Sequence, residues 1–216
     1  MKTEKVSTKT FRQRIYEKLR QKIISAEILP GGTITMRELA RIFGVSLMPV
    51  REALWQLESE KVIVIKSNRN IRVNSLTPEE MLDSLNIRVF LECMAAERAC
   101  EKRPDSVLPK VKHYLEALRK NVKNRKQYLL SNSQFHFAIY SCCNSPIFMQ
   151  QIQSLWARIG PYLSIYFAEG GDIAAAMKLH EGMYAALCRR DKKRIAELVR
   201  KDLEATGKFI ISRMKQ

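Results

Sequence analysis

The chain has 216 residues, enough for one large domain or two small ones that each bury a core. It is 46% hydrophobic with only 8 Gly and 7 Pro, which favours a mainly helical globular protein and argues against a disordered one. The net charge of +16 favours a polyanionic partner, either nucleic acid or an anionic membrane surface, although a soluble protein can also simply be basic.

The sequence carries no signal for export or membrane insertion. No run reaches the roughly 18 apolar residues of a membrane-spanning helix, and the basic residues 1–14 lack the apolar core of a signal peptide. The five cysteines are an odd number, and Cys142 and Cys143 are adjacent, a poor geometry for a disulfide. We therefore expect reduced thiols, a cytoplasmic location and no membrane partner.

The first two predicted helices are separated by a strong break. Residues 10–26 have their apolar side chains at helical spacing, and the Leu-Pro-Gly-Gly sequence at 29–32 ends that helix. Thr35 as N-cap and Glu38 three residues later form a capping box, which predicts a second helix. Gly44 is the residue type that usually follows a helix C-terminus, so we expect the second helix to end there.

A third helix and a β-hairpin follow. Ser46 is the predicted N-cap of the helix, and Pro49 falls in its first turn, where a missing N–H costs nothing. Residues 61–76 carry two β-branched runs around the turn-forming residues 67–70, which indicates a hairpin. The order helix, turn, helix, hairpin is that of a winged helix-turn-helix. The second helix of such a motif, the recognition helix, enters the major groove of DNA, and the hairpin is the wing.

Four arginines are candidates for DNA contacts in that arrangement. Arg51 lies near the start of the predicted recognition helix, Arg37 near the start of the helix before it, and Arg69 and Arg72 on the wing. A helical unit that only displays charge is the alternative. Residues 1–75 hold 15 Lys and Arg against 7 Asp and Glu, the same excess as in the much longer remainder, and this favours DNA.

Residues 10–75 resemble the winged helix-turn-helix of the GntR family of bacterial transcription regulators. The resemblance rests on "LPGGTITMRELARIFGVS" and "PVREALWQLESEKVI", and the run Pro-Val-Arg-Glu-Ala-Leu at 49–54 is highly specific. It implies that Arg37 and Arg51 contact operator DNA and that Ser46 and Met48 lie at the tip of the recognition helix. The family usually has Arg directly after the cap Ser, whereas this chain has Leu47, so we expect a different operator preference.

A second domain is predicted to begin at residue 76, giving domains 1–75 and 76–216. Thr77, Pro78 and Glu80 form a sharp helix start. Beyond it the periodicity is helical throughout, so we expect an all-α bundle after the winged helix-turn-helix and a mainly α protein overall. The six predicted helices cover 77–102, 106–122, 125–142, 146–167, 173–189 and 192–214.

The second domain resembles the FCD type, the effector-binding helical domain of the FadR-like branch of the GntR family. The resemblance rests on residues 88–100, 132–140 and 180–203. It implies a divalent metal site, and the matching positions are Asn132, His136, His180 and Asp202. Two of these depart from the family pattern, since Asn132 replaces an Asp and Asp202 replaces a His.

Two interpretations of these four residues remain open. Two His, one Asp and a weak amide oxygen could hold Zn²⁺, Ni²⁺ or Mn²⁺, with less affinity than the full set. Alternatively, the two histidines are hydrogen-bonded polar residues inside a bundle.

Three further residues are candidates for effector binding. Arg88 lies among apolar neighbours and needs a partner, which is either Glu92 one turn later or the carboxylate of a bound ligand. Arg158 and Tyr162 could line the same cavity.

The sequence contains no G-x-S-x-G, P-loop, H-E-x-x-H or Rossmann pattern, so we do not expect an enzyme. We expect a sequence-specific, DNA-binding transcription regulator that acts as a homodimer on operator DNA and responds to a small effector. Two alternatives are a metal-dependent hydrolase with an accessory nucleic-acid-binding domain, and a general RNA-binding or architectural protein.

Overall fold

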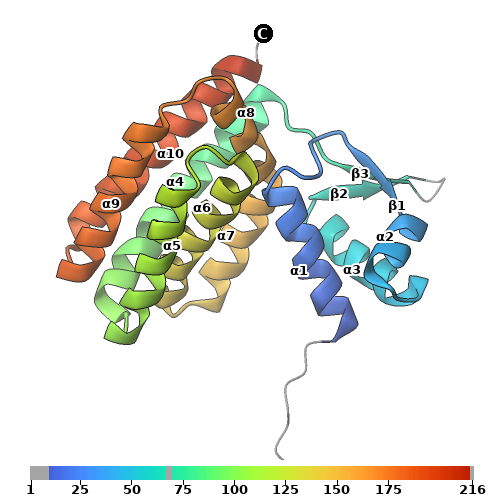
Figure 1. The fold of residues 1–216 in the computed structure, drawn as a ribbon, viewed down its shortest axis with the longest axis horizontal. Helices are drawn as coiled ribbons and strands as arrows, with labels where there is room; N and C mark the ends of the chain where they lie inside the picture. Colours follow the sequence, from blue (N-terminus) through green and yellow to red (C-terminus); the bar gives the residue numbers. More distant parts are fainter. Residues whose placement is uncertain (1–9, 67–69, 215–216) are drawn as a thin grey trace, which may run out of the picture.

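The computed structural model describes residues 10–66 and 70–214. Its N-terminal part combines three helices with a small antiparallel sheet (Figure 1). The helices are α1 (Phe11–Ile24), α2 (Met36–Phe43) and α3 (Leu47–Ser59), and the strands are β1 (Thr33–Thr35), β2 (Ile63–Ile65) and β3 (Asn70–Val73). The predicted winged helix-turn-helix is present.

The starts of these helices follow from their capping residues. The predicted capping box at Thr35 is confirmed, and Gly44 ends α2 with a φ of 63°, a conformation that glycine adopts without strain. The predicted N-cap position of Ser46 is confirmed, although its side chain makes no cap hydrogen bond. The third helical position is Pro49, which has no N–H to donate to the Ser46 hydroxyl.

The sheet has three strands in the order β1-β3-β2, whereas the sequence predicted a two-stranded hairpin. The added strand is β1, which places Thr33 opposite Arg72 and Thr35 opposite Asn70. Its three residues lie between the break at 29–32 and α2, and the last of them, Thr35, is also the N-cap of α2. Such a short strand leaves little pattern to detect. The predicted turn at the tip of the hairpin lies largely outside the described residues.

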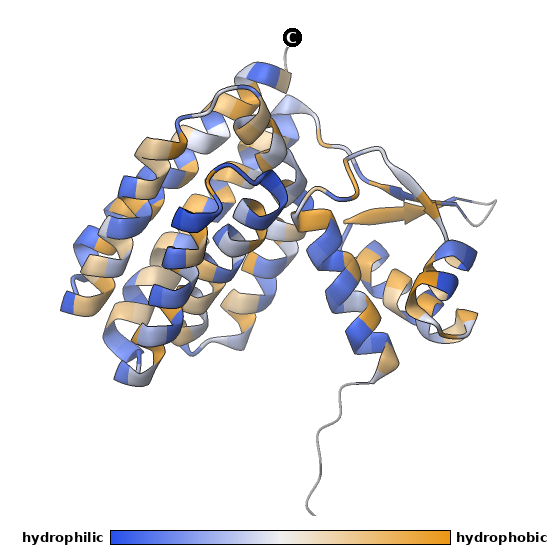
Figure 2. Cartoon of the chain, viewed as in Figure 1, coloured by the Kyte–Doolittle hydropathy of each residue, from blue (hydrophilic) through white to orange (hydrophobic). Residues whose placement is uncertain are grey.

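The C-terminal part is a bundle of helices (Figure 1). Its helices are α4 (Pro78–Lys102), α5 (Leu108–Lys120), α6 (Arg125–Tyr140), α7 (Pro146–Ile159), α8 (Leu163–Ala168), α9 (Ile173–Arg189) and α10 (Lys192–Met214). Three short 3-10 turns lie at Asp105–Val107, Ser141–Cys143 and Gly160–Tyr162. Hydrophilic and hydrophobic segments alternate along the helices, as amphipathic packing requires (Figure 2). Within the described ranges, no helix has the length and apolar character needed to cross a membrane.

The predicted helix 146–167 is interrupted, so the bundle has seven α-helices in its described residues instead of six. Helix α7 ends at Ile159, a 3-10 turn follows, and α8 begins at Leu163. Pro161 has no N–H for an α-helical hydrogen bond, which explains the break. Gly160 lies against α1, where a Cβ atom would come within 3.1 Å of the Ile24 Cα atom.

Helix α1 joins the two parts, and Figure 1 shows it between α7 and α3. One face contributes to the core of the N-terminal part, which also contains Ala157 of α7. On the other face, the Arg20 guanidinium donates a hydrogen bond to the Gln153 carbonyl. The Leu76 N–H donates to the Tyr162 hydroxyl at 2.6 Å, after β3 and just before α4. The two parts therefore share a packed interface.

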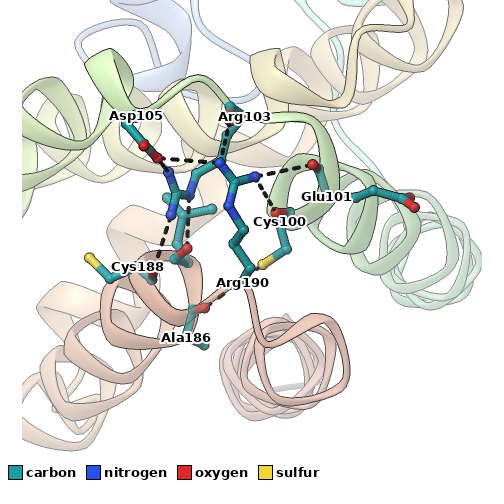
Figure 3. Close-up of polar contacts among 8 residues, drawn as sticks. Cys100, Glu101, Arg103, Asp105, Ala186, Cys188 and Arg190 are labelled. Carbon is teal, nitrogen blue, oxygen red and sulfur yellow. Dashed lines mark hydrogen bonds and ion pairs between the residues drawn. The ribbon is translucent and has the colours of Figure 1, made fainter.

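Two arginines close one end of the bundle by capping each other's helices (Figure 3). Arg103 is buried and directly follows α4. Its guanidinium donates hydrogen bonds to the carbonyls of Leu187 and Cys188 at the end of α9, at 2.9 Å each. Arg190, at the end of α9, donates to the carbonyls of Cys100 and Glu101 at the end of α4 and of Arg103 just beyond it. Asp105 forms an ion pair with both guanidinium groups. Each cation also opposes the negative end of the other helix's dipole.

Candidate functional site

One face of α3 packs into the core and the other is open to solvent. Val50, Ala53, Leu54 and Leu57 are buried. Arg51 is exposed on the opposite side, near the N-terminus of the helix, where a recognition helix presents its base-contacting residues. The other exposed side chains of this helix are Leu47, Met48, Trp55 and Ser59.

The other predicted DNA contacts surround this helix. Ser46 and Met48 are exposed at its start, and Arg37 is exposed in the first turn of α2. Arg72 is exposed on β3, the second strand of the wing. Arg69 lies outside the described residues. The described members of the set are therefore all accessible to a macromolecular partner.

A second group of predicted residues meets inside the bundle. His136 of α6, His180 of α9 and Asp202 of α10 are buried, and their ligand atoms lie within 4.8 Å of one another. The His136 Nε2 atom is 3.2 Å from the His180 Nε2 atom and 3.5 Å from an Asp202 carboxylate oxygen. Residues from three helices thus converge at one point.

The geometry suits a divalent ion. A tetrahedral ion with bonds of about 2.0–2.1 Å keeps its ligand atoms about 3.3 Å apart, close to the separations of the two histidines and Asp202 here. The Tyr140 hydroxyl is 3.0 Å from the His136 Nδ1 atom, one turn later on α6. That contact orients the imidazole so that Nε2 faces His180 and Asp202. The three side chains could therefore hold a metal ion.

Burial sets the protonation of this cluster. Desolvation lowers the pKa of His136 well below its usual value and that of His180 to about 4, so both imidazoles are neutral at neutral pH. A neutral imidazole has the lone pair that a metal requires. Desolvation also raises the pKa of Asp202 to about 7, because a buried carboxylate without a cation is costly.

The cluster opens onto a small cavity of about 40 Å³. Asn132, one turn before His136, lines this cavity together with His180 and Asp202. Arg88 and Trp156 line it as well, and the Arg88 guanidinium lies 4.7 Å from the centre of the Trp156 ring. These polar side chains thus line a space whose other lining residues are mostly apolar.

Arg88 has the partner that the sequence suggested. Its Nε atom donates to a Glu92 carboxylate oxygen at 2.6 Å, and both side chains are buried. The second Glu92 carboxylate oxygen has no hydrogen-bond partner in the described structure. No hydrogen bond from the two terminal Arg88 nitrogens to a described residue is found, so they remain available on the cavity side.

The expectation that Arg158 and Tyr162 line the cavity was wrong, because neither is among its lining residues. Arg158 is two positions after Trp156, which turns it to the opposite face of α7. The Tyr162 hydroxyl instead accepts a hydrogen bond from the Leu76 N–H. Sequence reasoning missed Trp156 and Tyr140. The i, i+4 spacing of His136 and Tyr140 was the available signal for the latter.

A winged helix-turn-helix with an exposed recognition helix, packed on a helical bundle with its own polar cavity, defines a two-part transcription regulator. Residues 11–73 match the gntR family of bacterial regulatory proteins, and residues 83–205 match the FCD domain. The chain belongs to the GntR family and carries an FCD domain.

Characterised relatives agree with this assignment. The chain is 27% identical to the HTH-type transcriptional regulator McbR of Escherichia coli K12, over 81% of each chain. It is 28% identical to the HTH-type transcriptional repressor GlaR of the same strain, over 87% of this chain and 90% of that one. The solved structure of E. coli McbR/YncC superposes with a TM-score of 0.87 at 24% identity, covering 95% of this chain and 99% of that one, and shows the same fold.

These matches establish the general function of the chain. The relatives are transcription regulators and repressors, so the chain is a transcription regulator and not an enzyme. The alternative of a metal-dependent hydrolase has no support among them.

Proposed function

We propose that this regulator binds a palindromic operator as a homodimer in the bacterial cytoplasm, and that a small effector in the bundle cavity changes its operator affinity. The exposed face of α3 is the observation that carries the DNA-binding part of the proposal. Arg51 reads a base edge in the major groove. The Ser46 hydroxyl, which α3 itself does not use, is left to accept or donate a hydrogen bond at the DNA backbone.

The surrounding basic residues position the protein on the duplex. Arg37 at the start of α2 contacts phosphate or the groove. The uncharged Met48 lies at the tip of the recognition helix, beside Arg51. Arg72 contacts phosphate or the minor groove from the wing, and the same role is proposed for Arg69. Phosphate contacts set the register of the protein, and base contacts then set the specificity.

Arg51→Ala is expected to weaken binding to a selected operator by about 1–3 kcal/mol and to erase discrimination among operator sequences. Fluorescence anisotropy with the operator and with scrambled duplexes measures both effects. Arg125→Ala is the charge-matched control, since Arg125 is exposed on the bundle at the start of α6. Unchanged relative affinities across sequences would refute the base contact. A wild-type protein that binds random duplex or RNA equally well would instead be a general nucleic-acid-binding protein.

A palindromic operator needs two recognition helices related by a two-fold axis. Helix α4 offers a surface for a second copy, because Leu82, Ile87 and Phe90 are large apolar side chains exposed to solvent. Leu82 and Phe90 border a groove between α4 and α10, whose other wall carries Arg200, Glu204 and Lys208. Apolar residues with a polar rim are typical of interfaces between subunits.

Phe90→Glu is expected to convert the protein to a monomer, because it places a charge on this apolar surface. Phe90 is 64% exposed, so the folded monomer tolerates the change. Sedimentation equilibrium measures the oligomeric state. Ile147→Glu is the matched control, since Ile147 is 72% exposed on α7. A dimer that survives Phe90→Glu, or is lost equally in the control, would contradict the proposed interface.

The cavity is the proposed effector site. His136, His180 and Asp202 would hold a divalent ion such as Zn²⁺, Ni²⁺ or Mn²⁺, with Asn132 as a weak additional oxygen ligand. The ion would supply positive charge and an open coordination position for an oxygen ligand. The two terminal nitrogens of Arg88 would pair with the same ligand, which favours a small carboxylate. The small volume of the cavity agrees with a compact effector.

Helix α7 connects this cavity with the DNA-binding part. Trp156 lines the cavity, and the next residue, Ala157, is buried in the core of the N-terminal part. Gly160 then packs against Ile24 of α1. A ligand that displaces Trp156 therefore acts on the contacts that hold α1, and so shifts the population of orientations of the two recognition helices. Operator affinity measured while small carboxylates are titrated into metal-loaded protein tests the coupling. An effector that binds the cavity and leaves operator affinity unchanged would refute it.

A further inference from the structure

The recognition helix presents two large apolar side chains at its exposed tip. Leu47 and Met48 form the first two positions of α3, and they are 39% and 58% exposed. The apolar contacts that stabilise α3 are made by Val50, Leu54 and Leu57 on its other side. The fold therefore does not require apolar residues at either position.

Their position relative to Arg51 restricts what they can touch. Leu47 lies one helical turn before Arg51, so the two side chains are neighbours on the exposed face. Met48 is displaced by about 100° around the helix axis from Leu47 and stands beside that pair. A major groove that accepts Arg51 at a base edge therefore receives both apolar side chains at adjacent base pairs.

The major groove offers these side chains one suitable group. Base edges there carry hydrogen-bond donors and acceptors, and the one apolar group among them is the C5-methyl of thymine. Leu has no hydrogen-bonding group and the Met thioether is only a weak acceptor, so neither side chain satisfies the donors and acceptors of guanine, cytosine or adenine at contact distance. From this geometry we infer that Leu47 and Met48 each contact a thymine methyl group, next to the base pair read by Arg51. The inference rests on the proposed operator binding and adds the bases that this operator contains.

The charges nearby favour DNA as the occupant of this apolar tip. Arg37 and Arg51 are both exposed on the helix-turn-helix, and Arg72 is exposed on the wing of the same part. A second copy of a chain with a net charge of +16 would bring like charges together there, whereas DNA brings phosphates. The tip thus combines cations for the backbone with apolar groups for base edges.

The test removes single methyl groups from the DNA. An operator is first selected from a random duplex pool with the full-length protein, and each thymine is then replaced in turn by deoxyuridine, which differs only in lacking the methyl group. We expect two positions in each half-site, adjacent to the guanine or other base read by Arg51, at which the replacement weakens binding about fourfold, the ratio expected for one buried methyl-sized group. Binding to a selected operator that no deoxyuridine replacement weakens would overturn the inference and leave operator binding intact.

Matched variants assign each methyl to its side chain. Leu47→Ala and Met48→Ala should each abolish the effect of deoxyuridine at one position and keep it at the other. Both residues are exposed, and alanine favours the helix, so neither variant should unfold. Ile42→Ala is the control, because Ile42 is an exposed apolar residue at the end of α2, and it should keep both effects. Full methyl dependence in both the Leu47 and the Met48 variant would overturn the assignment. A pool from which no sequence is enriched would overturn the proposed operator binding, and this inference with it.

Discussion

A protein with His136→Ala and His180→Ala together is expected to bind no stoichiometric divalent metal, whereas the parent protein does. The two imidazoles are two of the three strong ligands that meet inside the bundle, and Asp202 with the weak oxygen of Asn132 leaves too few to hold an ion. Elemental analysis of the purified proteins and calorimetric titration with Zn²⁺, Ni²⁺ and Mn²⁺ measure the difference.

The third histidine of the chain provides the control. His113 is exposed on α5, so His113→Ala should keep the metal content of the parent protein. Since both metal-site histidines are buried, a His136→Gln, His180→Gln protein serves as a second variant of more similar volume, in case the alanines disturb packing. Equal metal in the double variants and the parent, or no metal affinity in the parent, would contradict the proposed site.

Arg103→Ala is expected to lower the free energy of unfolding by about 2–4 kcal/mol. The change leaves the Leu187 and Cys188 carbonyls at the end of α9 without their charged donor, and removes the ion pair with Asp105. Losing hydrogen bonds from a buried charged group is costly, because the freed groups recover little hydration. Urea denaturation followed by far-ultraviolet circular dichroism measures the loss.

Arg189→Ala separates this effect from a general loss of positive charge. Arg189 lies in the last turn of the same helix α9 but is exposed, so its replacement should change stability by about 0.5 kcal/mol or less. Arg103→Lys should recover only part of the stability, because an ammonium group cannot reach two carbonyls and a carboxylate with the forked geometry of a guanidinium. Equal losses in the Arg103→Ala and Arg189→Ala proteins would show that the capping contacts contribute little.

Local signals predicted the fold well where the deciding contacts are local. The capping boxes at Thr35 and Thr77 involve residues three positions apart, and both are present. Strand β1 depends on a distant partner, because it pairs with β3, where Arg72 lies opposite Thr33. The single-sequence pattern holds no information about such a pair, so β1 was missed. The break after Ile159 was missed although Pro161, which lies within the predicted helix 146–167, is a local signal for it.

The candidate metal site shows the same division. Resemblance to a family supplied His136, His180, Asp202 and Asn132, and the first three meet in the structure, though their role stays a prediction. Trp156 was missed because its place beside the cavity depends on how α7 packs. Arg158 was misplaced although its angular offset from Trp156 on α7 can be read from the sequence.

The shared core of the two parts limits how this regulator can be recombined. Ala157 belongs to the bundle by sequence but completes the core beneath the winged helix, and Gly160 leaves room for Ile24. A chimaera that joins residues 1–75 to the bundle of another family member would place different side chains in this interface, where they need not pack against α1. Transplanting the DNA specificity of this protein is therefore better done by exchanging the exposed residues of α3 than by exchanging whole domains.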